Sequence, residues 1–372
     1  MKKIPLMDLY AFNKDIQEDV NTELNKLVVS SSFVGGKYLE EFETSYAKFC
    51  ETNFCIGVAN GTEALSVILR ALEIGSGDEV ITTTHTFIAT VEAILCVGAT
   101  AVLVDIDPKT ALIDLTLLEK AITPKTKAIM PVHLYGSVVD LDRLTDMAKS
   151  YRVALIQDAA QAHGGRWNNK PLGAFGEAQS YSFFPGKNLG AWGDAGAITT
   201  NDENLATKMS AIRNHGRLKS EKYLHHLFGA NWRMDPLQAM VLNKKLTFLD
   251  AKNRLRCDLY KKYVSALIDV GDLSFLDISP KAASVHHLFV VRTKKRDSLR
   301  AYLTEHEIET GIHYPVPLHQ QPALKNENVV SRGPLHNAEE LSTQILSLPF
   351  FPEITDDSLE RLFSTIKDFF RG

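Results

Sequence analysis

Residues 55–215 alternate between short apolar segments and amphipathic segments, and this alternation limits the possible folds more than any other feature. Apolar segments of four to eight residues are typical of buried strands, and apolar residues at helical spacing indicate the helices between them. We expect strands at 55–58, 79–83, 101–105, 128–134, 153–158, 179–183 and 195–200, and helices at 63–74, 86–97, 115–121 and 140–151. Repeated strand–helix units predict an α/β fold with a mainly parallel sheet covered on both faces, and such sheets bind ligands beyond the carboxyl ends of their strands.

The pattern changes after residue 235. A long helical stretch over 235–268 leads to an expected small α+β domain. In it we expect strands at 287–292 and 310–314, helices at 296–306, 339–346 and 356–370, and a polar, loop-like stretch at 324–335. The predicted domains are therefore a large one, 1–250, and a small one, 251–372, with the N-terminal 30 residues or so packing with the small domain.

Composition excludes several partners for this chain of 372 residues. The net charge of −4 provides no basic field for nucleic acid or an anionic membrane. No run approaches 18 apolar residues, and the basic start of the chain lacks the apolar core of a signal peptide. The four cysteines match no zinc pattern, so we expect no metal site, and so few in a long chain suggest free thiols in the cytoplasm.

Lys187 and Asp158 each follow an apolar strand. Lys187 comes after the run 178–184 and precedes a glycine-rich turn, while Asp158 ends the strand at 153–158. Pyridoxal phosphate chemistry needs an amine to form a Schiff base and an anion to keep the pyridine nitrogen protonated. Burial beside a cofactor would also lower the pKa of Lys187, as a nucleophile and base requires. An ordinary ion pair between strand ends is the alternative.

A phosphate site is expected where the strand at 55–58 meets the next helix. Gly61 allows close approach of the backbone, Thr62 offers a hydroxyl, and a helix N-terminus presents unpaired N–H groups to an anion. Ser182 lies on the strand before Lys187 and could bind the same phosphate. The alternative is that Thr62 simply caps the helix. A Gly-x-Gly-x-x-Gly fingerprint is absent from the chain, so a lone phosphate fits better than a dinucleotide, and a Rossmann dehydrogenase is disfavoured.

Three further residues follow strand ends. Phe87 could stack on a flat heterocycle or could belong to the core. Gln161 could donate to the phenolate oxygen of the ring. His163 is a possible base, but a histidine beside two glycines is more often structural.

These motifs together resemble the aspartate-aminotransferase-like fold, fold type I of the pyridoxal phosphate enzymes. Within that fold, the chain is similar to the nucleotide-sugar aminotransferases of the DegT type, which serve antibiotic and surface-polysaccharide biosynthesis, including that of lipopolysaccharide O-antigen. The resemblance covers nearly the whole chain. Its motifs lie at 35–43, 60–65, 104–108, 158–164, 182–187, 213–216, 229–234 and 311–315.

The resemblance implies a role for each matching position. It implies that Lys187 carries the cofactor and moves protons, and that the amino donor is L-glutamate in a ping-pong cycle through pyridoxamine phosphate. Asn231 matches a residue that the neighbouring subunit supplies, which implies a homodimer with shared active sites. The cofactor contacts implied are Asp158 for the pyridine nitrogen, Gln161 for the ring hydroxyl, Phe87 for the ring face, Gly61, Thr62 and Ser182 for the phosphate, and Asn231 from the partner.

Residues 185–191 and 311–319 are similar to members that aminate C-3 of a dTDP-linked 3-keto-6-deoxyhexose. That likeness implies that His313 and Tyr314 lie near the sugar or its phosphates, with Lys222 as a further candidate. Packing at a strand end is the alternative for His313 and Tyr314. Phe184 departs from the tyrosine of several C-3 members.

Other activities remain open on the same fold. They are amination at C-4 of a dTDP- or UDP-linked 4-keto sugar, amination of a keto-cyclitol, and a non-catalytic regulator that binds the cofactor. A dehydratase relative would carry histidine where this chain has Lys187.

Overall fold

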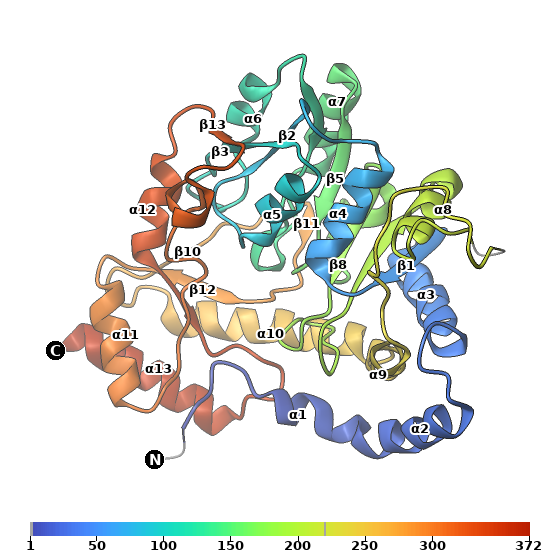
Figure 1. Cartoon of the computed structure of the whole chain (residues 1–372). Coiled ribbons are helices and arrows are strands. Elements are labelled where there is room, and N and C mark those ends of the chain that lie inside the picture. Colours follow the sequence, from blue (N-terminus) through green and yellow to red (C-terminus); the bar gives the residue numbers. More distant parts are fainter. Residues whose placement is uncertain (1–2, 219–220) are drawn as a thin grey trace.

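The computed structural model describes residues 3–218 and 221–372, and a twisted central sheet organises the fold (Figure 1). Its order is β1-β9-β8-β5-β4-β2-β3-β13. Neighbours from β8 through β5, β4, β2 and β3 to β13 pair in parallel, whereas β9 is antiparallel to both β1 and β8. The strands are β1 (Phe54–Val58), β2 (Glu79–Thr83), β3 (Thr100–Val104), β4 (Thr126–Ile129), β5 (Ala154–Asp158), β8 (Ala178–Ser182), β9 (Gly196–Thr200) and β13 (Val329–Ser331). The predicted α/β fold with a mainly parallel sheet is confirmed.

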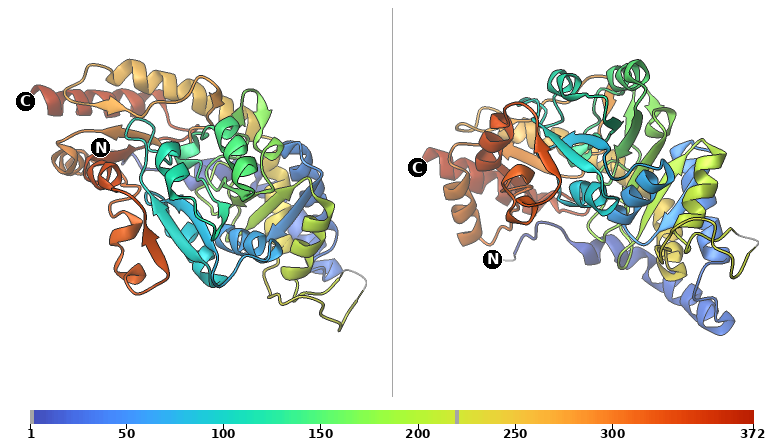
Figure 2. Two further views of the ribbon diagram at one scale, coloured as in Figure 1. Left: turned by 90° about the horizontal axis from the view of Figure 1, so that it is seen from above. Right: turned by 45° about the horizontal axis from the view of Figure 1, so that its top comes forward.

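Helices cover both faces of this sheet, as Figure 2 shows from two further directions. Because side chains alternate along a strand, Ile81 packs into the core on one face and its neighbour Val80 into the core on the other. The first face is covered by α3 (Lys37–Cys50), α6 (Leu115–Ala121), α7 (Leu141–Tyr151) and α9 (Pro236–Leu246), and the second by α4 (Gly61–Ala71), α5 (Ala89–Cys96) and α8 (Glu203–Ile212). No helix in residues 3–218 or 221–372 has the length and hydrophobicity to cross a lipid bilayer.

A second, smaller core lies beside the sheet and contains most of the C-terminal elements. It is built on a three-stranded sheet of order β10-β12-β14. The elements around it are β10 (Ser274–Phe275), β12 (Phe289–Arg292), β14 (Ile345–Leu348), α10 (Leu249–Leu267), α11 (Arg296–Glu305) and α13 (Asp356–Arg371). Helix α12 (His336–Gln344) packs Ala338 and Leu341 into the core of the central sheet. A small sheet of order β11-β6-β7 joins β11 (Ala282–Ala283), β6 (Arg166–Trp167) and β7 (Lys170–Pro171).

The N-terminal segment contacts the smaller core at its start and helix α9 farther along. Ile4 pairs with Ile308 and belongs to the smaller core. Farther along, Ile16 and Val20 pack against Met240 of α9. The helices of this segment are α1 (Leu9–Asn13) and α2 (Gln17–Ser30). The division into domains 1–250 and 251–372 stays a prediction.

Four predicted elements are wrong, each for a local reason. The helix at 235–268 is two helices that separate at 247–248, and the periodicity runs through the break because no glycine or proline marks it. The strand at 128–134 ends at Ile129, since Pro131 cannot donate to a ladder. Residues 345–348 are strand β14 although their apolar residues continue the helical spacing of α12, and the loop-like stretch 324–335 contains the edge strand β13.

The predicted strand at 310–314 is also wrong. Only Gly311 pairs there, in a single bridge to Ser347. The backbone departs from strand pairing after Gly311: the carbonyl of His313 accepts a hydrogen bond from the hydroxyl of Tyr135, in the loop after β4, while the His313 ring stays beside Ser347 of β14. This departure brings residues 313–314 to the carboxyl ends of the central strands.

Candidate active site

The N-terminus of α4 lies directly against the end of β8. Asn60 caps the helix by accepting a hydrogen bond of 2.9 Å from the N–H of Glu63, so the idea that Thr62 is the N-cap is wrong. A Cβ atom on Gly61 would lie 2.7 Å from the Cβ of Ser182. In the described part of the chain, the backbone N–H groups of Gly61 and Thr62 have no acceptor. Unpaired N–H groups beside a serine hydroxyl form a cradle for an anion.

Lys187 lies in the turn after β8, where its N–H donates to the carbonyl of Phe184 at 2.8 Å. Within the described residues, its Nζ makes no hydrogen bond or ion pair. Burial lowers the pKa of Lys187 to about 8, while the carboxylate of Asp158 raises it. The amine is therefore far easier to deprotonate than an ordinary lysine, as covalent chemistry requires.

The residue after Lys187 anchors the turn. Asn188 is buried and donates to Asn253 at 3.1 Å and to the carbonyl of Val285 at 3.0 Å. Its side-chain oxygen accepts a hydrogen bond of 3.1 Å from His287. Three bonds from two segments, α10 and the loop before β12, hold the side chain of Asn188, so Lys187 is positioned by an anchored turn.

Asp158 ends β5 with a buried carboxylate. Burial raises its pKa, and three contacts lower it: the N–H of Ala160 at 3.2 Å, the hydroxyl of Thr90 at 2.9 Å and the charge of Lys187. The carboxylate is thus held by donors on its protein side, and each oxygen retains a lone pair for a further partner.

Gln161, Phe87 and Tyr314 form one side of the site. Gln161 accepts from the N–H of Tyr135 at 2.6 Å and donates to the hydroxyl of Tyr314 at 3.3 Å. The ring of Tyr314 lies 5.7 Å from that of Phe87, centroid to centroid. Phe87 is 53% exposed, so its interpretation as a core residue is wrong. Burial raises the pKa of Tyr314 to about 12, so its hydroxyl keeps its proton.

His313 is held beside this group. Its Nδ1 lies 2.8 Å from the hydroxyl of Ser347, and Tyr135 donates to its carbonyl. Burial lowers the pKa of His313, and the charge of Lys187 lowers it further. His313 is therefore held between Ser347 of the small sheet and Tyr135 from the loop after β4, while Tyr314 reaches Gln161, which follows β5 of the central sheet.

His163 has a structural position. It is fully buried, and its Nε2 donates to the carbonyl of Ser182 at 2.9 Å. Burial lowers its pKa to about 3, so the ring stays neutral. The histidine supports the end of β8 from which the Lys187 turn begins.

Lys222 and Asn231 lie on an exposed segment after α8. Lys222 has its Nζ 5.3 Å from the ring centroid of Tyr223, and Asn231 pairs with Asn214 in an isolated antiparallel bridge. Over residues 3–218 and 221–372, neither side chain has a hydrogen bond or ring contact with Lys187, Asp158 or Gln161, so contacts within one chain do not join these two predicted residues to the others.

A model of the DegT/DnrJ/EryC1/StrS aminotransferase family matches residues 14–367. The chain belongs to this family. It is therefore an aminotransferase, and the predicted family is confirmed.

Two relatives of this family member are named as transaminases of dTDP-linked 3-amino sugars. The chain is 39% identical to the dTDP-3-amino-3,4,6-trideoxy-α-D-glucose transaminase of Streptomyces venezuelae, over 98% of this chain and 96% of that protein. It is 41% identical to the dTDP-3-amino-3,6-dideoxy-α-D-galactopyranose transaminase of Aneurinibacillus thermoaerophilus, over 98% of each. A crystal structure of DesV from S. venezuelae superimposes with a TM-score of 0.96 at 38% identity and covers all of both chains.

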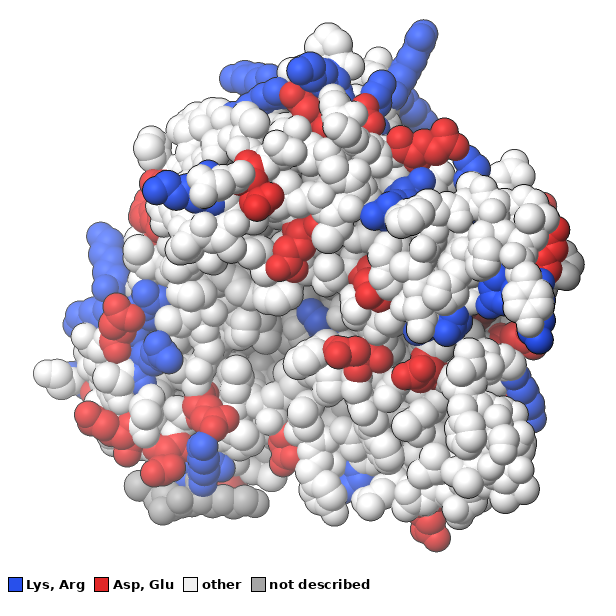
Figure 3. Space-filling model, in the orientation of Figure 1, with Lys and Arg blue, Asp and Glu red and all other residues white. Residues whose placement is uncertain are grey.

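The site fits the cofactor of this aminotransferase family, pyridoxal phosphate. The unpaired N–H groups at Gly61 and Thr62 suit its phosphate, Asp158 suits its protonated ring nitrogen, and the unpaired amine of Lys187 suits its aldehyde. The surface drawn in Figure 3 is hollowed near its centre, with basic atoms visible inside and acidic side chains along the rim.

Sequence reasoning missed three residues of the site: Asn60, Thr90 and Tyr135. Asn60 could have been found, since an asparagine three residues before Glu63 has the spacing of a helix cap with a following acidic residue. Thr90 and Tyr135 carry no such signal. Their contacts with Asp158 and His313 join segments that only the tertiary fold brings together.

Proposed function

We propose that this aminotransferase transfers the amino group of L-glutamate to C-3 of a dTDP-linked 3-keto-6-deoxyhexose. The observation that carries the proposal is that Lys187, Asp158 and Gly61 lie at or just after the carboxyl ends of β8, β5 and β1, where the charge of Asp158 acts on Lys187 and Gly61 lies against Ser182. The names of two close relatives, both dTDP-3-amino sugar transaminases, support C-3 as the position.

Each side chain has a defined task in this proposal. Gly61, Thr62 and Ser182 bind the phosphate, and Asp158 holds the ring nitrogen in its protonated form. Lys187 would hold the cofactor through its Nζ. Once the amine of the substrate has displaced it from that bond, the free Nζ would take the proton from the donor carbon and return one to the acceptor carbon. When bound, pyridoxal phosphate supplies a conjugated ring that stabilises negative charge at the reacting carbon.

Other groups orient the reactants. Phe87 covers one face of the ring, and Gln161 donates to the ring hydroxyl. His313 and Tyr314 contact the sugar or its phosphates, and their neutral state avoids a buried charge beside Lys187. We assign Lys222 to the nucleotide, because its exposed, positively charged ammonium can pair with the negative phosphates.

Amination at C-4 is the second candidate, and Phe184 favours it. This residue is 58% exposed beside the Lys187 turn and lacks the hydroxyl of tyrosine. An assay with L-glutamate and either a dTDP-3-keto- or a dTDP-4-keto-6-deoxyhexose separates the two. The proposal predicts an amino sugar from the 3-keto substrate; an amino sugar formed solely from the 4-keto substrate would replace C-3 by C-4.

A homodimer with shared active sites is part of the proposal. Tyr223 and Phe228, on the segment that leads to Asn231, are each 82% exposed, and a second copy would cover such apolar side chains. The thiols of Cys50 and Cys55 are free and buried, which fits a reducing cytoplasm.

Mixed dimers test the shared site. Lys187→Ala subunits and Asn231→Ala subunits are each expected to lose most activity alone. If Asn231 serves the neighbouring subunit, mixing the two variants places both mutations in one site and leaves the other site intact, so activity returns. Mixtures that stay as inactive as the separate variants would contradict a shared site.

A further inference from the structure

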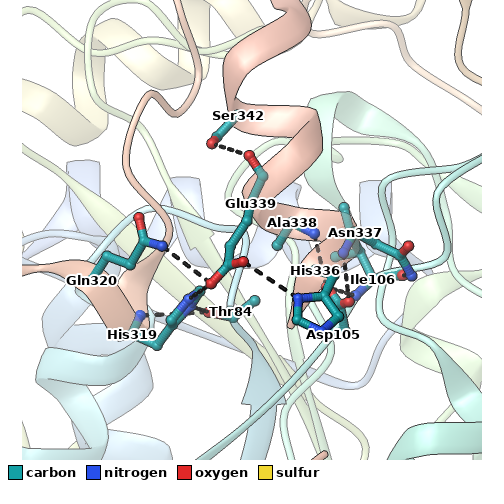
Figure 4. A network of polar contacts seen from close by, with 10 residues as sticks. All are labelled: Thr84, Asp105, Ile106, His319, Gln320, His336, Asn337, Ala338, Glu339 and Ser342. Carbon is teal, nitrogen blue, oxygen red and sulfur yellow. Dashed lines mark hydrogen bonds and ion pairs between the residues drawn. The ribbon is translucent and has the colours of Figure 1, made fainter. Parts of the chain in front are cut away.

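His319, Thr84 and Glu339 form a polar junction behind the aromatic side of the site (Figure 4). The Nδ1 of His319 lies 2.7 Å from the hydroxyl of Thr84, and its Nε2 lies 2.9 Å from Oε1 of Glu339. The side chain of Thr84 is fully buried, and that of His319 is 14% exposed. A substrate therefore cannot reach the threonine hydroxyl, and the junction has no direct part in the chemistry.

The carboxylate fixes the direction of the hydrogen bond between His319 and Glu339. A carboxylate can only accept, so the Nε2 of His319 carries hydrogen and donates to Glu339. In the neutral ring, Nδ1 then accepts from the hydroxyl of Thr84. The negative carboxylate strengthens the first bond, which in turn favours the second.

The junction is tied to two adjacent strands of the central sheet. Thr84 directly follows β2, and its carbonyl accepts a hydrogen bond of 2.8 Å from the N–H of Leu318. Glu339 lies in α12, whose first N–H groups, at Asn337 and Ala338, donate to Asp105 at the end of β3. Because β2 and β3 pair in parallel, Thr84 and Asp105 follow neighbouring strands and are fixed relative to each other.

Two short chain segments connect the junction to the aromatic residues of the site. Residues 85–87 lead from Thr84 to Phe87, and residues 314–318 lead from Tyr314 to His319. Pro315 and Pro317 stiffen the second segment, since proline fixes its own φ angle. Phe87 is thus linked to Thr84, and Tyr314 to His319. The hydrogen bond between Thr84 and His319 therefore connects the two segments whose rings lie 5.7 Å apart.

We propose that His319 and Glu339 are positioning residues for the sugar acceptor: they fix Tyr314 against Phe87 and thereby shape the place where the nucleotide sugar binds. This inference rests on the proposed function. Lys187 and the Gly61 cradle are held by other elements, and Phe87 has a second anchor, because its carbonyl accepts a hydrogen bond of 3.3 Å from the N–H of Thr90. Loss of the junction should therefore act mainly on Tyr314 and the sugar acceptor, and much less on the reaction with the small donor glutamate.

Single-turnover kinetics of the two half-reactions test this split in Glu339→Ala and Thr84→Val. Loss of a buried or charge-assisted hydrogen bond corresponds to roughly a tenfold change in an equilibrium constant. We expect the KM for the keto sugar to rise about tenfold, with the rate of the glutamate half-reaction within about twofold of wild type. Thr84→Ser keeps the hydroxyl and should restore the low KM.

His336→Ala is the matched control. His336 also approaches Glu339, with Nδ1 3.5 Å from Oε2, but its side chain is 85% exposed and does not contact Thr84. We expect this variant to keep the wild-type KM. Equal losses in both half-reactions of Glu339→Ala, or an unchanged KM for the sugar, would overturn the inference.

A crystal structure of Glu339→Ala without cofactor gives a readout that needs no activity. We expect the Phe87 and Tyr314 rings to move apart from their 5.7 Å separation. Rings that keep this separation would overturn the inference even if the proposed function holds. If the wild-type protein aminates no keto sugar, the proposed function fails, and the structure of the variant still tests the junction.

Discussion

The hydroxyl of Thr90 donates a hydrogen bond of 2.9 Å to Oδ2 of Asp158, inside the protein and away from solvent. Burial raises the pKa of this carboxyl, and the Thr90 bond opposes that rise. Asp158 must stay ionised to hold a protonated ring nitrogen. Thr90 therefore supports the cofactor through Asp158.

Thr90→Val tests this support because it removes the hydroxyl at nearly constant volume. Without the bond the pKa of Asp158 rises, so the acidic limb of the activity profile should move to higher pH. A hydrogen bond to a charged group contributes about 1.5–3 kcal/mol, so turnover should fall by roughly ten- to a hundredfold. The profile of kcat against pH measures both effects. Thr90→Ser keeps the donor, and a Val variant with the Ser variant's profile would contradict the role.

Gly61→Ala probes the phosphate cradle. The added methyl group would lie 2.7 Å from the Cβ of Ser182 and push α4 away from β8. Overpacking of this kind costs about 1–3 kcal/mol, so the Kd for pyridoxal phosphate should rise by roughly five- to a hundredfold.

Gly75→Ala is the matched control, since its methyl group would meet its nearest atom, the carbonyl oxygen of Val97, at 3.4 Å. Fluorescence titration with the cofactor compares the two variants. Equal affinities in Gly61→Ala and Gly75→Ala would show that the close contact does not shape the cradle.

The lowered pKa of Lys187 predicts an unusual pH dependence. With a pKa of about 8, the unprotonated fraction grows roughly tenfold between pH 7 and pH 9 and then levels off. A lysine with an ordinary pKa would gain about a hundredfold and continue to rise. Stopped-flow rates of covalent capture of pyridoxal phosphate by the apoprotein, compared with a lysine peptide, distinguish these curves. Asp158→Asn removes the charge that raises the pKa of Lys187, so its curve should shift to lower pH.

Lys187→Ala tests the proton transfer. Adding L-glutamate to the wild-type holoenzyme should convert the cofactor to its amino form, with loss of its visible absorption band. In Lys187→Ala the change should slow by at least about a thousandfold, since both the covalent amine and the base are lost. If glutamate leaves the visible absorption band of the wild-type holoenzyme unchanged, the protein would instead be a regulator that binds the cofactor.

The central sheet could be predicted because each strand and helix has its own pattern of apolar residues within a short stretch of sequence. The strand at 79–83 and the helix at 115–121 have the predicted bounds. The elements that failed depend on distant partners. Residues 345–348 become a strand by pairing with β12, and the backbone at His313 departs from strand pairing, where its carbonyl accepts a hydrogen bond from Tyr135.

The site divides in the same way. Lys187, Asp158 and Gly61 follow or precede predicted strands, so the fold alone gathers them. Thr90 and His319 act through hydrogen bonds between segments far apart in the chain, and no local pattern reports such contacts. Asn231 would complete the site of a second copy of the chain, as the family resemblance implies. The fold of one chain alone cannot show such a contact.

The most direct test of the account is to identify the lysine that carries the cofactor. Borohydride reduction of the holoprotein fixes the covalent bond, and mass spectrometry of its peptides locates it. Lys245 is the internal comparison, because burial lowers its pKa to about 7, yet its Nζ bonds to Asn13 at 3.1 Å and lies over the ring of Phe12. The account predicts modification at Lys187. Modification at Lys245 instead, or at no lysine, would contradict it.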